Sequence, residues 1–138
     1  MRVQFLNKLI TEDVHEGIYE LHTPFYCWIE NDDGSEIEVK IPRGFLTDKC
    51  SVPRIPFAYL LFGGKGEKAG VLHDALYSPF KGISVVDMDE RCSVPVTREW
   101  ADAVLYAALK ACGVGWQAWW MYKGVRLFGW QFYKREAN

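Results

Sequence analysis

Side chains that could do chemistry are concentrated in three short segments of the 138-residue chain, at 47–51, 72–77 and 99–102. Each segment lies among apolar neighbours. A carboxylate or imidazole taken out of water is destabilised by several kcal/mol unless it is paired, hydrogen-bonded or bound to a metal. We therefore expect the polar residues of the three segments to meet in one site, made up of Thr47, Asp48, Ser51, His73, Asp74 and Asp102.

Two kinds of hydrolytic chemistry are open to these residues. One imidazole and several carboxylates suit a divalent metal that activates water, with Asp48, His73, Asp74 and Asp102 as ligands and zinc, manganese or magnesium as the ion. A metal-free version would use Ser51 as the nucleophile and His73 as its base. The sequence around Ser51 is unlike a nucleophile elbow, so we rank this version second. The catalytic candidates are Asp48, Ser51, His73 and Asp74.

A structural role competes with both. An adjacent His73 and Asp74 is a weak signal, because the same residues could form a buried hydrogen-bond network that fixes the segment at Asp48 to two helices. The sequence holds no His-Glu-x-x-His, P-loop, Gly-x-Ser-x-Gly or Gly-x-Gly-x-x-Gly pattern. The common zincin, nucleotide-binding and hydrolase-elbow mechanisms are therefore excluded.

The elements that must position these residues differ between the two halves of the chain. The runs 18–22 and 25–29 are rich in β-branched and aromatic residues, and a turn at 31–35 leads into the alternating run 37–41, which predicts a hairpin. Apolar spacing predicts a helix over 67–77. Thr97 as N-cap and Gly113 after the last apolar residue delimit a second helix, and 114–134 reads as a third.

This order predicts an α+β fold in a single domain over 1–138, in which N-terminal antiparallel β-hairpins form a small sheet and three helices pack on it. The strand-rich part is 1–50 and the helical part 55–135. A surface loop is expected at about 78–96, with a small strand at 83–86.

The third helix shows two apolar stripes, and a domain of this size can cover only one of them. We assign one stripe to the core, namely Met121, Val125, Phe128 and Phe132. The other holds Trp116, Trp120 and Leu127. Together with the neighbouring Trp119, its tryptophans are the candidates for partner binding. Basic residues frame this stripe and favour an acidic or polar partner over burial in lipid: Lys123, Arg126 and Lys134.

Composition narrows the remaining function classes. A formal net charge of -2 gives no overall attraction to phosphate backbones, so nucleic-acid binding is not expected. No apolar run is long enough to span a membrane, and the N-terminal residues lack the apolar core of a signal peptide. Four widely spaced cysteines without a Cys-x-x-Cys pair favour reduced thiols over a zinc knuckle.

Two motifs carry a resemblance to a known family. Gly-Phe-x-Thr-Asp followed by Ser-x-Pro at 44–53, and His-Asp-x-Leu-Tyr at 73–77, resemble the family numbered 1353 among domains of unknown function, over about 38–130. That family occurs mainly in tailed bacteriophages and prophages. The resemblance implies a phage origin and a polar cluster at Asp48, Ser51, His73, Asp74 and Asp102. Cys50 stands where a small residue is expected, which argues against a cysteine nucleophile.

Two functions are therefore expected of a phage protein with these residues. The first is a metal-dependent hydrolase with a His/Asp site that acts on the cell wall or on a small molecule or nucleotide. The alternative is a non-enzymatic virion component, in the tail or head-tail region, or an assembly factor that uses its aromatic C-terminal helix as an interface. The expected partners are phage structural proteins or a second copy of the chain, and the expected location is the host cytoplasm or the virion.

Overall fold

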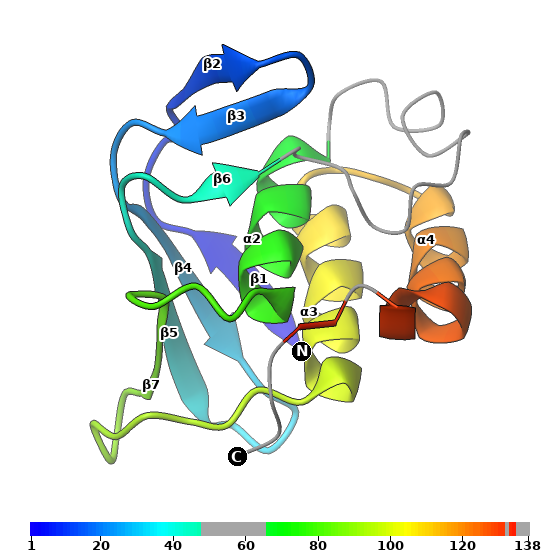
Figure 1. The fold of residues 1–138 in the computed structure, drawn as a ribbon. Helices are drawn as coiled ribbons and strands as arrows, with labels where there is room; N and C mark the ends of the chain where they lie inside the picture. Colours follow the sequence, from blue (N-terminus) through cyan, green and yellow to red (C-terminus); the bar gives the residue numbers. More distant parts are fainter. Residues whose placement is uncertain (48–65, 132, 135–138) are drawn as a thin grey trace.

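The computed structural model describes residues 1–47, 66–131 and 133–134 of the chain (Figure 1). Within these residues, strands precede helices, with one late strand between the first two helices. The elements are β1 (Arg2–Phe5), β2 (Thr11–His15), β3 (Ile18–Leu21), β4 (Phe25–Glu30), β5 (Glu36–Ile41), β6 (Leu46–Thr47), α2 (Glu67–Tyr77), β7 (Ser84–Asp87), α3 (Arg98–Ala111), α4 (Gln117–Phe128) and the 3-10 turn η1 (Gly129–Gln131). The expectations at Asp48, Cys50, Ser51 and Phe132 lie outside the described residues.

The larger sheet has the order β1-β4-β5-β7, with antiparallel neighbours. Alternate residues of β4 and β5 are buried, as expected for strands with one face on a core. Across this pair Cys27 lies opposite Val39, and both are fully buried. The turn between these strands contains Gly34 at a φ of 86°, a left-handed conformation that glycine adopts without strain. The predicted hairpin is confirmed.

The last strand of this sheet lies inside the segment expected to be a surface loop. Ser84–Asp87 pairs with β5 as β7, one residue later than the small strand predicted at 83–86. The smaller sheet has the order β2-β3-β6 and is antiparallel throughout. Its strand β6 ends at Thr47, so this sheet positions Thr47, the first polar residue of the expected site.

The helices form successive layers over the larger sheet (Figure 1). Helix α3 packs against β1, against α2 and against α4, so it lies at the centre of the helical half. Its ends follow the sequence closely, because the Thr97 side chain accepts a hydrogen bond from the Trp100 amide and Gly113 has a φ of 83°. The α+β class and the single domain are confirmed. No helix among the described residues is long and apolar enough to cross a membrane.

The third helix is shorter than predicted. It spans Gln117–Phe128 rather than 114–134, and the chain then tightens into η1. Met121 and Val125 are buried as expected, but Phe128 is 54% exposed, so its assignment to the core is wrong. At this end of α4 the chain approaches Tyr77 through the backbone of Gly129. Phe128 is the last residue of α4, so the buried stripe of Met121 and Val125 is not continued by a further helical turn that could cover its ring.

Candidate functional site

Asp102 of α3 is the centre of a buried polar cluster. Its Oδ1 accepts hydrogen bonds from His73 Nε2 at 2.9 Å and from the Tyr77 hydroxyl at 2.5 Å. Its Oδ2 accepts a hydrogen bond from Arg126 Nη1 at 2.8 Å, and Arg98 Nη1 lies 3.8 Å away. Because these partners come from α2, α3 and α4, the single carboxylate of Asp102 links all three helices.

His73 and Tyr77 reach the same carboxylate because they are four residues apart on α2 and share one face of that helix. Their rings lie against each other, with centroids 4.1 Å apart. His73 is fully buried and Tyr77 nearly so. The His-Asp-x-Leu-Tyr motif therefore supplies two of the partners of Asp102 in one turn of helix.

The contact with Asp102 fixes the tautomer of His73. An ionised carboxylate only accepts hydrogen bonds, so Nε2 carries the hydrogen and Nδ1 of the neutral ring is left as a lone-pair acceptor. Nδ1 is buried and has no hydrogen-bond partner among the residues that the structure describes. A buried polar atom without a partner is rare in proteins and needs an explanation, such as a bound water or ion, local strain or a catalytic role.

Burial and hydrogen bonds set the charges of the cluster. Burial lowers the pKa of His73 below its ordinary 6.5 and outweighs Asp102, whose hydrogen bond and charge raise it. Burial acts to raise the pKa of Asp102, but hydrogen bonds from His73, Tyr77 and Arg126 together hold that pKa below its ordinary 3.8. Burial, followed by the hydrogen bond to Asp102, raises the pKa of the Tyr77 phenol. At neutral pH a neutral imidazole therefore faces an ionised carboxylate.

Asp74 lies beside His73 in the sequence and belongs to a second contact. The Thr47 hydroxyl donates a hydrogen bond to Asp74 Oδ2 at 2.6 Å, across 27 positions of the chain. This contact ties β6 to α2 next to His73. The structure thus brings His73 to Asp102 and Asp74 to Thr47, two contacts within the set of six residues expected to meet in one site, while Asp48 and Ser51 lie outside the described residues.

Three members of the cluster were missed in the sequence analysis: Tyr77, Arg98 and Arg126. Tyr77 follows His73 by four positions and Arg98 precedes Asp102 by four, so helical spacing could have found both. Arg126 had no such signal, because its contact depends on how α4 packs on α3. Arg98 also donates to the backbone oxygens of Val125 and Arg126 at 3.0 and 3.1 Å, which secures the end of α4.

The chain is packed closely against the cluster at Gly129. A Cβ atom at this position would lie 2.7 Å from the Tyr77 hydroxyl and 3.4 Å from Arg98 Nη1. Real Cβ atoms do not approach other atoms to 2.7 Å, so a side chain here would push the Tyr77 hydroxyl away from Asp102. The absence of a side chain at Gly129 therefore allows the cluster to close.

A metal site is not formed by the described part of the chain alone. No group of three or more His, Cys, Asp or Glu side chains among the described residues could hold a metal ion. Both oxygens of Asp102 already accept hydrogen bonds, Oδ1 from His73 and Oδ2 from Arg126. Its surroundings are those of a residue that orients His73, the role that carboxylates have behind catalytic and metal-binding histidines.

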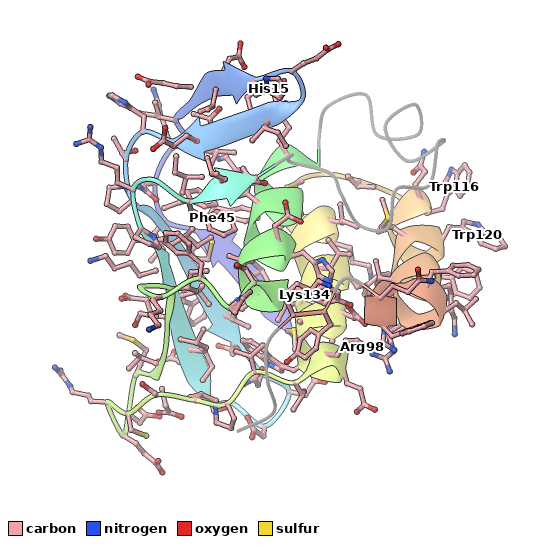
Figure 2. All side chains as sticks on the ribbon, in the orientation of Figure 1. His15, Phe45, Arg98, Trp116, Trp120 and Lys134 are labelled. Carbon is pink, nitrogen blue, oxygen red and sulfur yellow. The ribbon has the colours of Figure 1, made fainter. Side chains whose placement is uncertain are left out.

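A separate cavity of about 850 Å³ opens beyond the end of α2. Lys81, Arg98 and Lys134 contribute basic groups to its lining, and Phe80 and Tyr133 contribute rings. Figure 2 labels Arg98 and Lys134, which lie near α3. Neither His73 nor Asp74 lines this cavity, but Arg98 belongs both to its lining and to the Asp102 cluster, so the cavity adjoins the cluster.

The predicted partner-binding residues lie on a different surface. Trp116 is 67% exposed and Trp120 is 58% exposed, and Figure 2 shows both side chains projecting from α4 away from the rest of the molecule. Trp119 is 45% exposed and contacts Trp120 edge to face, with centroids 4.9 Å apart. With three further exposed residues they form what we call the aromatic face: Trp116, Trp119, Trp120, Leu127, Phe128 and Trp130.

The comparisons with known proteins support the resemblance seen in the motifs. One protein-family model matches residues 20–125, a range that contains His73, Asp74, Tyr77 and Asp102. No curated protein and no solved structure matches the chain. Since the matched range covers well over half of the sequence, the chain belongs to the family described as Protein of unknown function (DUF1353).

Proposed function

We propose that this protein is a hydrolase of phage origin in which His73 is the general base that activates water. The observation that carries the proposal is the buried Nδ1 of His73, which has a free lone pair while Nε2 is held by Asp102. A base of this kind needs a neutral imidazole at working pH, and burial lowers the pKa of His73 in that direction.

In this mechanism Nδ1 takes a proton from a water molecule, whose oxygen attacks the electrophilic carbon or phosphorus of the substrate. The imidazolium then returns the proton to the leaving group, so the protein ends unchanged. Asp102 stabilises the imidazolium while it exists, and it keeps Nδ1 directed at the water. The Tyr77 hydroxyl, which donates to the same oxygen as His73, and Arg126, which donates to the other oxygen, hold Asp102 in place.

A divalent cation is part of the proposal. Asp74 lies beside His73, and Asp48 directly follows Thr47, whose hydroxyl contacts Asp74. These two carboxylates offer the oxygen ligands that magnesium or manganese prefers and that zinc also accepts, which would leave Nδ1 of His73 free to act as the base. A bound cation would polarise the scissile carbonyl or phosphoryl group. Ser51 remains a second candidate nucleophile.

Complete burial of His73 places a condition on this function. The side chain has no exposed surface, so substrate and water reach Nδ1 only when neighbouring residues move. Carbethoxylation by diethyl pyrocarbonate measures this opening, because the reagent modifies unprotonated imidazole nitrogens. His15 and His22 are the only other histidines and provide internal references in the same protein.

The function is tested by assaying the purified protein against peptidoglycan, nucleotides, and chromogenic esters and phosphate esters. Each assay is run after chelation and again with zinc, manganese or magnesium added. We expect His73→Gln to lower the rate by about 100-fold or more, the scale of general-base catalysis. His22→Gln is the matched control, since His22 contacts Glu12 on the surface away from the cluster. Equal rates in wild type and His73→Gln would contradict the proposal.

The second candidate is a non-enzymatic virion component or assembly factor. Exposure of the aromatic face supports it, because large exposed rings at a helix surface are typical of interaction sites. In this case the Asp102 cluster only fixes three helices together, and phage structural proteins or a second copy would cover the rings. Light scattering of the wild type and of Trp116→Ser/Trp120→Ser tests the second-copy case. A dimer that the double substitution dissociates would support it.

A further inference from the structure

We propose that the aromatic face docks on an anionic lipid surface at the depth of the headgroups. The proposal concerns α4 and η1 and does not depend on hydrolysis at His73. Exposure, the chemistry of the exposed rings and the distribution of charge support it independently.

The first observation is the size of the unpartnered surface. Four of the six tryptophans of the chain lie between 116 and 130, and Trp116, Trp120 and Trp130 are each more than half exposed. Leu127 extends the same surface at 67% exposure, and Phe128, about 80° further round the helix from Trp120, borders it at 54%. Contiguous exposed apolar groups on this scale mark a surface that another body covers.

The type of ring indicates which kind of partner covers this surface. Tryptophan has a large apolar ring with one polar N–H, and it is enriched where a membrane meets water. Helices that lie in this interface carry Trp, Phe and Leu on the inserted face, together with basic residues. Helix α4 has this composition on the aromatic face, while Ala118, Met121 and Val125 bury its opposite side against the protein.

The charge distribution supplies the complement to an anionic surface. The range 103–135 contains five basic residues and no acidic residue, whereas the whole chain has a net charge of -2. Lys123 lies within the aromatic face, because at about 100° per residue it falls between Trp119 and Trp120 on the helix. Its Nζ is 5.3 Å from the centroid of the Trp119 ring. Arg126 is paired with Asp102, so the other four basic residues give this region a moderate positive charge that the net charge of the whole chain conceals.

This charge distribution favours lipid over a second copy of the chain. Two aromatic faces brought together would bring the Lys123 side chains of both copies to one interface, and neither α4 nor η1 has an acidic residue to pair with them. An anionic bilayer offers negative charge over its whole surface, and each nearby Lys or Arg strengthens attraction to it. Docking at headgroup depth differs from burial in hydrocarbon, which Lys123 in the middle of the rings would oppose.

Vesicle binding tests the proposal on the intact chain. Binding is measured by co-sedimentation and by the blue shift of tryptophan fluorescence. The probes are vesicles of phosphatidylcholine alone, and of phosphatidylcholine and phosphatidylglycerol in a three-to-one ratio. We expect binding to the anionic vesicles that weakens as salt is added. Trp116→Ser/Trp120→Ser should weaken it by about tenfold or more, and Lys123→Gln by about fivefold.

The matched control is Val14→Ser/Leu46→Ser, which removes two exposed apolar side chains from the smaller sheet. It should bind the anionic vesicles as the wild type does. The proposal is overturned if the wild type binds neither kind of vesicle, or binds both equally well. It is also overturned if the tryptophan substitutions leave vesicle binding unchanged, or if a dimer, or a complex with a protein, covers the aromatic face.

Discussion

The Asp102 cluster and the aromatic face invert the usual distribution of residues in opposite ways. The cluster places an ionised carboxylate, an imidazole and a phenol inside the protein, and nearly every polar atom there has a partner. The aromatic face places apolar rings in water, and the described part of the chain leaves them uncovered. Arg126 of α4 connects the two regions, because its guanidinium reaches Asp102.

The difference between the two regions shows which of them is accounted for by contacts within the protein. Buried polar groups are tolerated when they satisfy one another, so the cluster is compatible with a stable fold, and removing one of its members leaves the others unpaired. Exposed rings contribute little to the stability of the protein that carries them. Contacts within the described residues account neither for the unpartnered Nδ1 of His73 nor for the exposed rings of the aromatic face. We assign function to these two features.

The largest effect on stability should come from Asp102→Ala. The substitution leaves Arg126 without its carboxylate and removes the acceptor of two further buried donors, a class of change that costs about 3 to 5 kcal/mol. Urea unfolding measures the loss. Asp13→Ala, on an exposed strand position, is the control and should change the free energy of unfolding by less than about 0.5 kcal/mol. A loss below about 1 kcal/mol at Asp102 would show that the cluster does not hold the helices together.

The next largest effect should come from Gly129→Ala. The new Cβ would lie 2.7 Å from the Tyr77 hydroxyl and must displace it from Asp102. Overpacking of this kind costs about 1 to 3 kcal/mol. Gly115→Ala is the matched control, since its Cβ would meet Gln117 Oε1 at an ordinary 3.6 Å. Equal unfolding free energies for the two variants would refute the role given to Gly129.

The third effect is a dependence of stability on pH. Burial lowers the pKa of His73 in the folded protein, so below pH 6.5 the unfolded chain binds more protons than the folded protein. Stability is therefore retained above about pH 6.5 and falls as the solution becomes more acidic, by at most about 1.4 kcal/mol per pH unit from this one group. Urea unfolding at several pH values should show a smaller acid loss in His73→Gln. An acid loss of the same size in both proteins would be inconsistent with a neutral buried His73.

The smallest effect should come from Trp116→Ser/Trp120→Ser. Because both rings are more than half exposed, the double substitution should lower the free energy of unfolding by less than about 1 kcal/mol. A loss above about 3 kcal/mol, the scale of large core truncations, would mean that the tryptophans belong to the core. Urea unfolding monitored by circular dichroism measures this without relying on tryptophan fluorescence.

Local patterns in the sequence predicted the elements well, and packing between elements was harder to predict. The limits of α3 follow from Thr97 and Gly113, whose preferences act within one turn. The contact between His73 and Asp102 was predicted from the requirement that buried polar groups be paired. The contact with Arg126 and the exposure of Phe128 depend on how α4 rotates and ends against α3, which no local pattern encodes.

The central claim is that His73 is a neutral base with a hydrogen on Nε2 and a free lone pair on Nδ1. Long-range ¹H–¹⁵N NMR distinguishes the two nitrogens, and with three histidines in the chain the signals can be assigned by His15→Gln and His22→Gln. At neutral pH we predict a protonated Nε2 and an unprotonated Nδ1 for His73, which persist to below pH 6.5. A hydrogen on Nδ1, or a charged ring at neutral pH, would contradict the account.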